Sequence, residues 1–240
     1  RQREDIDALL ANPATEPALA QRLALARDIR AFGIAQMGLP ESGSYTRYVA
    51  TGRDAVSWIV VAAPEFSLEA KTWCFLVAGC VPYRGYFEQA DADRFAAKLR
   101  DKGYDVLVAG ATAYSTLGWF DDPLLDTMFG RDDADLAGTL FHEMAHQRLY
   151  VADDTAFNES YASFVEEVGV QRWLTARGEP ARFDTWLERR ALSAASDEVI
   201  REHRDRLERL YSGGGEADTM RARKQAILAE LCVELAALGA

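Results

Sequence analysis

The sequence predicts an α+β fold in which an N-terminal region with a mixed sheet is followed by a largely helical C-terminal half. Segments rich in Val, Ile, Tyr and Trp, which favour strands, lie before residue 112. From residue 133 onward, apolar residues recur at helical spacing. A chain of 240 residues, 49% of them hydrophobic, can bury a sizeable core. We therefore expect a single domain over residues 1–240, with a helix-and-sheet lobe at 1–130 and a helical lobe at 131–240.

The N-terminal lobe alternates between helix and strand patterns. Pro17 begins a strongly apolar helix, and Gly38-Leu39-Pro40 ends it. Thr51-Gly52-Arg53-Asp54 separates two strand-like segments, which predicts a hairpin. Asp122 and Pro123 fit the cap and the first position of a short helix. In chain order, the expected elements are helices at 1–12 and 17–37, hairpin strands at 45–50 and 55–63, a strand at 73–81, a helix at 89–102 and a strand at 105–111.

The C-terminal lobe is expected to be almost entirely helical. Four helices are predicted. The first covers residues 133–150, the second contains Glu159 and ends near residue 176, and the last two cover residues 183–211 and 217–238. Val151-Ala152-Asp153-Asp154 connects the first two helices, and Ser212-Gly213-Gly214-Gly215 is a flexible break before the last. In an α+β layout of this kind, a sheet edge commonly runs beside the first of these helices and can pair with an extended peptide, and the 105–111 strand is the candidate for it.

The first of these helices contains a metal-binding pattern. His142-Glu143-Met144-Ala145-His146 has the form H-E-x-x-H. Residues four apart lie one above the other on a helix face, so both imidazoles can bind one zinc ion. Glu143 can take the proton of the attacking water. The chain has only three histidines and two of them stand here, which favours metal binding over a chance match.

A third ligand follows at a suitable distance. Glu159 stands 13 residues after His146, which allows a turn and a second helix packed against the first. Its carboxylate would complete three protein ligands and leave a fourth position for water, as in catalytic zinc sites. The alternative is a solvated glutamate in the first turn of a helix, where the helix dipole favours it. The buried-type residues that follow Asn158 and Glu159 favour the ligand.

Charge, hydropathy and cysteine content bear on the partners, the location and the disulfides of the protein. A net charge of −11 argues against a nucleic-acid partner, because phosphate contacts need a basic face. No apolar run is long enough to span a bilayer, and the start at Arg1 leaves an earlier targeting segment open. Cys74 and Cys80 flank a short apolar segment, where a disulfide and two buried thiols are both open alternatives. Cys232 lies in an apolar helical pattern and is expected to be free and buried.

Several segments resemble a bacterial family of zinc aminopeptidases predicted to belong to the gluzincins. With the helix before Pro40, the similarity extends to about residue 175. The segments that carry it are Trp73-Cys74-Phe75, Gly79-Cys80-Val81-Pro82-Tyr83-Arg84-Gly85-Tyr86-Phe87, Ala113-Tyr114-Ser115-Thr116-Leu117-Gly118-Trp119-Phe120, Phe141-His142-Glu143-Met144-Ala145-His146-Gln147 and Phe157-Asn158-Glu159-Ser160-Tyr161-Ala162.

The resemblance implies a zincin-like peptidase fold of the gluzincin type, with Zn²⁺ on His142, His146 and Glu159. It also implies a location in the cell envelope of a Gram-negative bacterium, in the periplasm, with a lipid anchor ahead of this chain as the only membrane attachment. If the protein is exported in this way, Cys74 and Cys80 are expected to be linked. Better-known gluzincins have an acidic residue one turn after the glutamate ligand, where this chain has Ser163. Glu166, on the same helix face, is expected to replace it.

The expected activity is zinc-dependent hydrolysis of a peptide substrate, with Glu143 as the general base. Tyr114 is the first choice for a tyrosine that stabilises the oxyanion, ahead of Tyr83, Tyr86 and Tyr161. Asn158 is expected to orient His146 or to cap a helix, two roles that do not exclude each other. Four acidic residues could bind the ammonium group of a substrate or could simply be solvated; they are Asp121, Asp122, Asp153 and Asp154.

Two other classes of function stay open. The protein could be an envelope protein that binds metal without peptidase activity, although an intact Glu143 argues against this. A structural helical protein without metal would require both histidines and Glu159 to be a coincidence, so it ranks last.

Overall fold

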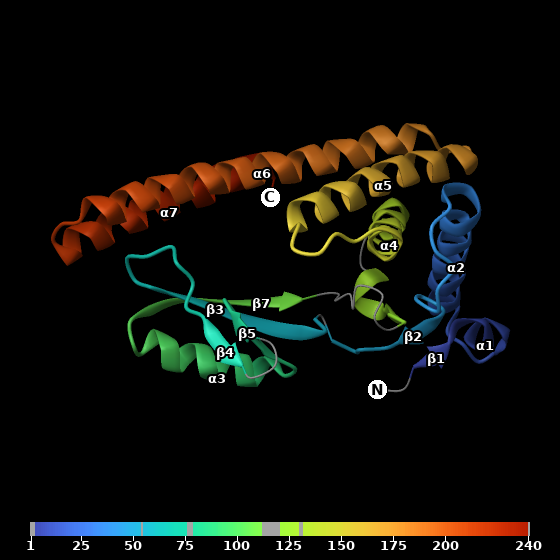
Figure 1. Cartoon of the computed structure of the whole chain (residues 1–240), viewed down its shortest axis with the longest axis horizontal. Helices are drawn as coiled ribbons and strands as arrows, with labels where there is room; N and C mark the ends of the chain where they lie inside the picture. The colour runs from blue at the N-terminus through green and yellow to red at the C-terminus, as the bar shows by residue number, and fades with distance from the viewer. Residues whose placement is uncertain (1–2, 54, 76–78, 112–120, 130–131, 240) are drawn as a thin grey trace. The chain divides into compact units, whose positions relative to one another are not determined.

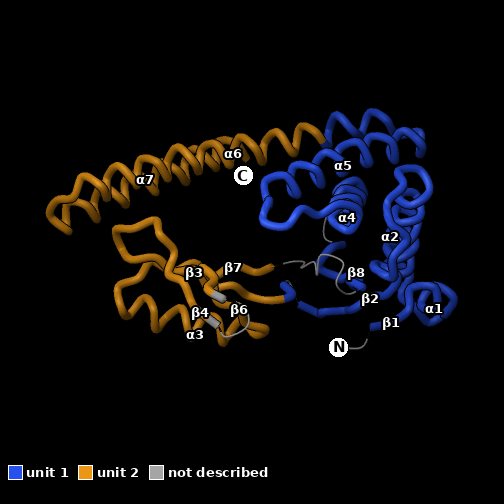
Figure 2. Tube along the Cα trace, viewed as in Figure 1, with its two compact units in different colours: residues 1–56, 112–186 blue, residues 57–111, 187–240 orange. Residues whose placement is uncertain are grey.

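The computed structural model describes residues 3–53, 55–75, 79–111, 121–129 and 132–239. The chain divides into two compact units, each built from two separate segments (Figure 2). Unit 1 contains residues 1–56 and 112–186, and unit 2 contains residues 57–111 and 187–240. This division differs from the lobes predicted to meet at residue 130, because each unit takes elements from both halves of the chain. The structure is nevertheless of mixed α and β composition, as predicted (Figure 1).

Unit 1 combines a small sheet with a cluster of helices. Its elements in chain order are β1 (Glu4–Asp5), α1 (Ile6–Ala11), α2 (Pro17–Met37), β2 (Arg47–Val49), β8 (Leu124–Leu125), the 3₁₀ helix η1 (Asp126–Phe129), α4 (Asp133–Arg148) and α5 (Thr155–Ala176). The central strand β2 pairs antiparallel with β1 and parallel with β8. Helix α4 packs against both α2 and α5, and its buried residues Leu140, Phe141 and Met144 form part of the core.

Glycines allow the helices around α4 to approach closely. A Cβ atom at residue 169 of α5 would lie 2.5 Å from Cδ2 of Phe141, and one at residue 33 of α2 would lie 3.2 Å from the same ring. On α4 itself, a Cβ atom at residue 138 would lie 3.0 Å from Oε1 of Glu166. The buried Phe141 ring is thus enclosed by two helix backbones, and it directly precedes His142.

Unit 2 is built around an antiparallel sheet of order β6-β3-β7. Its elements are β3 (Ser57–Pro64), β4 (Trp73–Phe75), β5 (Gly79–Val81), β6 (Arg84–Tyr86), α3 (Gln89–Arg100), β7 (Tyr104–Ala111), most of α6 (Ala181–Gly213) and α7 (Ala217–Leu238). Val60 and Ala62 of β3 pack with Ala92, Ala96 and Leu99 of α3 to form its core. Strand β7 has one pairing partner among the described residues, so it stands at an edge of this sheet, which is the part of its prediction that the structure tests. Among the described residues, no helix combines the length and apolar character that a membrane span requires.

The predicted hairpin between residues 45–50 and 55–63 is wrong. Strand β2 belongs to the sheet of unit 1, whereas β3 belongs to the sheet of unit 2. The segment expected to form the hairpin turn binds Asp126 instead. The Asp126 carboxylate accepts hydrogen bonds from Thr51 N at 2.9 Å and from Gly52 N at 2.8 Å. The short helix predicted to start at Pro123 is also wrong, since β8 follows directly and the helical turn begins only at Asp126.

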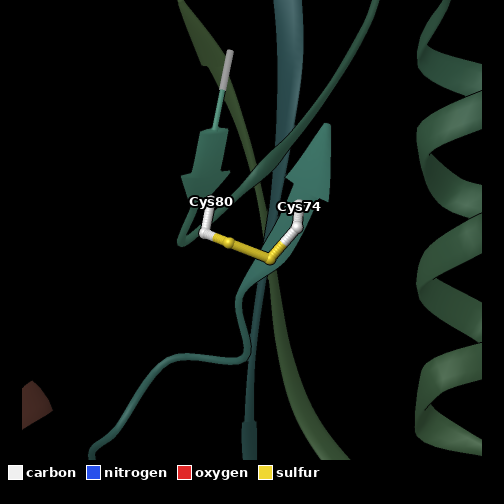
Figure 3. Close-up of a disulfide and its surroundings, with 2 residues drawn as sticks. All are labelled: Cys74 and Cys80. Atoms are coloured by element: carbon white, nitrogen blue, oxygen red, sulfur yellow. A yellow bond between two sulfur atoms is a disulfide. The ribbon is translucent and has the colours of Figure 1, made fainter. Parts of the chain in front are cut away.

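The cysteines bear out one expectation and contradict another. Residues 73–81 form the hairpin of β4 and β5 rather than one strand, and its two cysteines face each other in register. A disulfide joins Cys74 to Cys80 (Figure 3), with 3.9 Å between their Cα atoms, which confirms the first of the two alternatives. Cys232 is free as expected, but the prediction that it is buried is wrong, because it lies on the solvent-exposed side of α7.

Candidate metal centre

The structure brings His142, His146 and Glu159 together. Nε2 of His142 lies 3.2 Å from Nε2 of His146 and 3.3 Å from Oε2 of Glu159. The remaining pair, His146 Nε2 and Glu159 Oε1, is 3.6 Å apart. One ligand atom from each residue lies within 4.8 Å of the others, a spacing at which the three could hold one metal ion. The histidine side chains are 20% and 5% exposed, whereas that of Glu159 is 56% exposed, so the group opens to solvent on the glutamate side.

Local sequence fixes the two helices that carry this group. The Asp132 side chain caps α4 by accepting a hydrogen bond from Ala134 N, and the Asp154 side chain caps α5 by accepting one from Phe157 N. Asp153 precedes this cap with a φ of 62°, a left-handed conformation that reverses the chain between the helices. Asp153 and Asp154 therefore shape the connection, and the prediction that they could bind a substrate ammonium finds no geometric support.

Asn158 has a structural role that differs from both predicted roles. Its Nδ2 donates to Val151 O at 2.7 Å, and its Oδ1 accepts from Val151 N at 2.8 Å. The buried side chain thus holds the connection between α4 and α5. It does not orient His146, whose buried Nδ1 has no hydrogen-bond partner among the described residues, and the cap of α5 is Asp154.

Glu166 lies where the sequence predicts an acidic partner for a histidine. Its Oε2 is 3.2 Å from Nδ1 of His142, and its side chain is only 13% exposed. Because a carboxylate accepts, Nδ1 carries the hydrogen, and Nε2 keeps its lone pair toward His146 and Glu159. The hydrogen bond to Glu166 raises the pKa of His142 above its usual value, although burial acts in the opposite direction. The contact thus selects the tautomer that a metal ligand needs.

Glu143 and Gln147 present unused polar atoms on α4. Oε2 of Glu143 and Nε2 of Gln147 are both buried and have no hydrogen-bond partner among the described residues. Being four residues apart, the two side chains lie on the same face of the helix. A buried carboxylate oxygen without a donor is unusual and is available to accept a proton or a hydrogen bond from a bound molecule.

The tyrosines predicted to stabilise an oxyanion are not shown at this site. Tyr114 lies outside the described residues. Tyr83 is exposed, Tyr86 packs on Phe95 in unit 2, and Tyr161 stacks on Phe157.

Tyr45 is a buried tyrosine that the sequence patterns did not single out. It is 4% exposed, and its backbone N donates to Asp122 O at 2.7 Å. Burial raises the pKa of its phenol, and the negative charges of Glu143 and Asp122 raise it further, so the phenol stays protonated. The run Ser42-Gly43-Ser44 before it has the composition of a turn, but no sequence pattern places such a turn beside α4.

Comparison with known proteins gives a family for the whole chain. The model of a family described as "Putative aminopeptidase" matches residues 1–240. No curated protein and no solved structure matches the chain significantly. The match covers every residue of the candidate metal centre, and the chain therefore belongs to this aminopeptidase family.

Proposed function

We propose that the chain is a zinc-dependent peptidase of the gluzincin type with a zincin-like fold, and that it removes residues from the amino terminus of peptides. Two imidazoles and one carboxylate are the donor set of many catalytic zinc sites. Two features of the site support zinc binding. The hydrogen bond to Glu166 leaves the Nε2 lone pair of His142 free, and the Nε2 atoms of both histidines lie toward Glu159. A zinc ion held there would supply a Lewis acid that polarises the scissile carbonyl and makes an attacking water more acidic.

Glu143 is the proposed general base. Its Oε2, which accepts no hydrogen bond from the part of the chain that the structure describes, can accept the proton of the attacking water and then deliver it to the leaving amine. Glu166 keeps the proton of His142 on Nδ1, so that this ligand remains in one tautomer throughout. The base and the three ligands come from two adjacent helices whose crossing is fixed by close glycine contacts.

One observation carries the proposal: two histidines and a glutamate from different helices converge beside Glu143, whose buried Oε2 has no hydrogen-bond partner among the described residues. A chain that only stored metal would have no need of that glutamate. We also propose an envelope location, with attachment to the membrane by a lipid anchor ahead of this chain. The Cys74–Cys80 disulfide supports an oxidising compartment for the protein.

The test is hydrolysis of a mixed peptide library by the zinc-loaded protein, with new amino termini identified by mass spectrometry. We expect sequential loss of N-terminal residues, which a chelator abolishes. The Glu143→Gln variant should keep its metal and its fold and lose a factor of about 10² to 10⁴ in turnover, the usual contribution of a general base. If the zinc-loaded wild type cleaves no peptide, the second function, metal binding without hydrolysis, takes first place.

A further inference from the structure

The segment from residue 41 to 46, here named the 41–46 loop, follows α2 and contacts the metal-carrying helix. Oγ of Ser42 donates to Oε1 of Gln147 at 2.8 Å. Glu143 lies one turn before Gln147 on the same face of α4. The 41–46 loop is therefore held against the face of α4 that presents the proposed general base, more than 90 residues away in the sequence.

The 41–46 loop is fixed from several sides. Arg30 of α2 donates to the carbonyl oxygens of both Ser42 and Ser44, the latter at 2.9 Å from Nε. Ser44 Oγ accepts from Asp122 N at 3.0 Å, which ties the loop to the segment before β8. These bonds hold the loop backbone without using any side chain of the proposed metal centre.

Tyr45 has a strained backbone within this loop. Its φ is 62°, in the left-handed region that bulky side chains rarely adopt. Such a conformation is energetically unfavourable and persists only where the surroundings enforce it, which occurs most often at functional sites. Here the hydrogen bond from Tyr45 N to Asp122 O and the bonds to Ser44 enforce it.

The Tyr45 hydroxyl is an unused donor in a loop that contacts this face of α4 through Ser42. The Tyr45 side chain is 4% exposed, and no hydrogen bond of its hydroxyl is present among the described residues. The neighbouring face holds the buried Glu143 Oε2, which likewise has no partner there. Since the phenol stays protonated, it can donate to an oxygen that acquires negative charge.

We propose that Tyr45 is a further catalytic residue of the hydrolysis proposed above, and that its hydroxyl donates a hydrogen bond to the scissile carbonyl oxygen as that oxygen gains negative charge. This inference rests on the proposed function. The tyrosine keeps its proton and forms no covalent bond, so its contribution is electrostatic. The 41–46 loop fixes the donor before substrate binds, which is why a strained conformation is retained.

Tyr45→Phe is the direct test, with Tyr48→Phe as the matched control. Tyr48 lies three residues away, is similarly buried, and stacks on Phe129 in the same unit. In Tyr45→Phe we expect unchanged zinc content and thermal stability, KM within about twofold, and kcat reduced about 10²-fold, as for the loss of one oxyanion donor. Tyr48→Phe should retain wild-type kcat. Equal kcat in Tyr45→Phe and wild type would overturn the inference.

A binding measurement separates this inference from the proposed function. A phosphinic pseudodipeptide, whose tetrahedral oxygens resemble the charged carbonyl oxygen, is titrated by calorimetry into zinc-loaded wild type and both variants. We expect Tyr45→Phe to bind it at least about 10-fold more weakly, part of the loss expected in kcat. If wild type binds the compound but cleaves nothing, the peptidase function fails, while this comparison still decides whether the Tyr45 hydroxyl binds the tetrahedral oxygen. Equal affinity of wild type and Tyr45→Phe for the compound would contradict the proposed role of Tyr45, and so would a wild type that does not bind the compound.

Discussion

Replacing Gly169 by alanine tests whether the metal-carrying helix is packed as tightly as described. In a helix this change alone stabilises by up to about 1 kcal/mol. Here, however, the added Cβ would lie 2.5 Å from Phe141 Cδ2 and 2.8 Å from Met37 Cε. Met37 can move its flexible end, but the fully buried Phe141 ring is also enclosed by Phe32 and Gly33. Overpacking of a core usually costs about 1–3 kcal/mol, so we expect a net loss of about 1–2 kcal/mol.

The assay is thermal and urea unfolding of metal-free protein. A loss of this size lowers the Tm of a domain of 150–250 residues by about 2–8 °C. Because Phe141 directly precedes His142, zinc affinity should fall as well. Gly213→Ala is the control, since a Cβ at this helical position meets nothing within 4 Å. If Gly169→Ala were as stable as wild type, the close crossing of α4 and α5 would be refuted.

Two further variants test individual contacts. Glu166→Gln keeps the shape of the side chain but removes the charge beside His142, so zinc affinity should fall about 10- to 100-fold; Glu167→Gln, on an exposed neighbour, should leave it unchanged. Asp126→Asn should cost about 1–2 kcal/mol at neutral pH, because hydrogen bonds to a charged acceptor are lost. Burial acts to raise the pKa of Asp126, but hydrogen bonds from Thr51, Gly52 and Thr127 outweigh it and lower the pKa. The stability from this carboxylate is therefore complete above its unfolded pKa near 3.9 and is lost as the pH falls through its lower folded pKa. The gap in urea-unfolding free energy between wild type and Asp126→Asn should close over that acid range; a gap independent of pH would contradict the assignment.

Helices were the most predictable part of the fold, because their signals are local. Helix α2 spans the predicted residues, between Pro17 in its first turn and Gly38, whose φ of 67° ends it. Helix α7 also has its predicted bounds, and α4 ends two residues earlier than expected. Caps and apolar periodicity act within a few residues of the helix they define, so the sequence displays them directly.

Strand pairing was predicted less well, because partners are chosen over long distances. Thr51 and Gly52 look like a hairpin turn in isolation. In the structure they bind Asp126, more than 70 residues later, and the flanking strands join different sheets. The Cys74–Cys80 disulfide could be anticipated as one of two alternatives, because the two cysteines lie close in sequence, but the hairpin that carries it was expected to be a single strand.

The candidate site shows the same contrast. The spacing of His142 and His146 follows from the helix that contains them, and the position of Glu166 follows from its place on the next helix. Tyr45 could not be found in this way, since its loop is held against α4 by contacts of Ser42, Arg30 and Asp122 from three separate segments. Asn158 was misassigned because a polar residue beside a ligand looks functional until its two bonds to Val151 are seen.

The most direct test of the central claim is zinc content measured at equilibrium against a chelator of known affinity, for wild type and Glu159→Ala. If His142, His146 and Glu159 hold the metal, wild type binds one zinc ion per chain. Removing the exposed glutamate, which is the easiest of the three to replace without disturbing the core, should then weaken binding severely while leaving the helical content intact. Wild type without stoichiometric zinc, or Glu159→Ala with the affinity of wild type, would contradict the account.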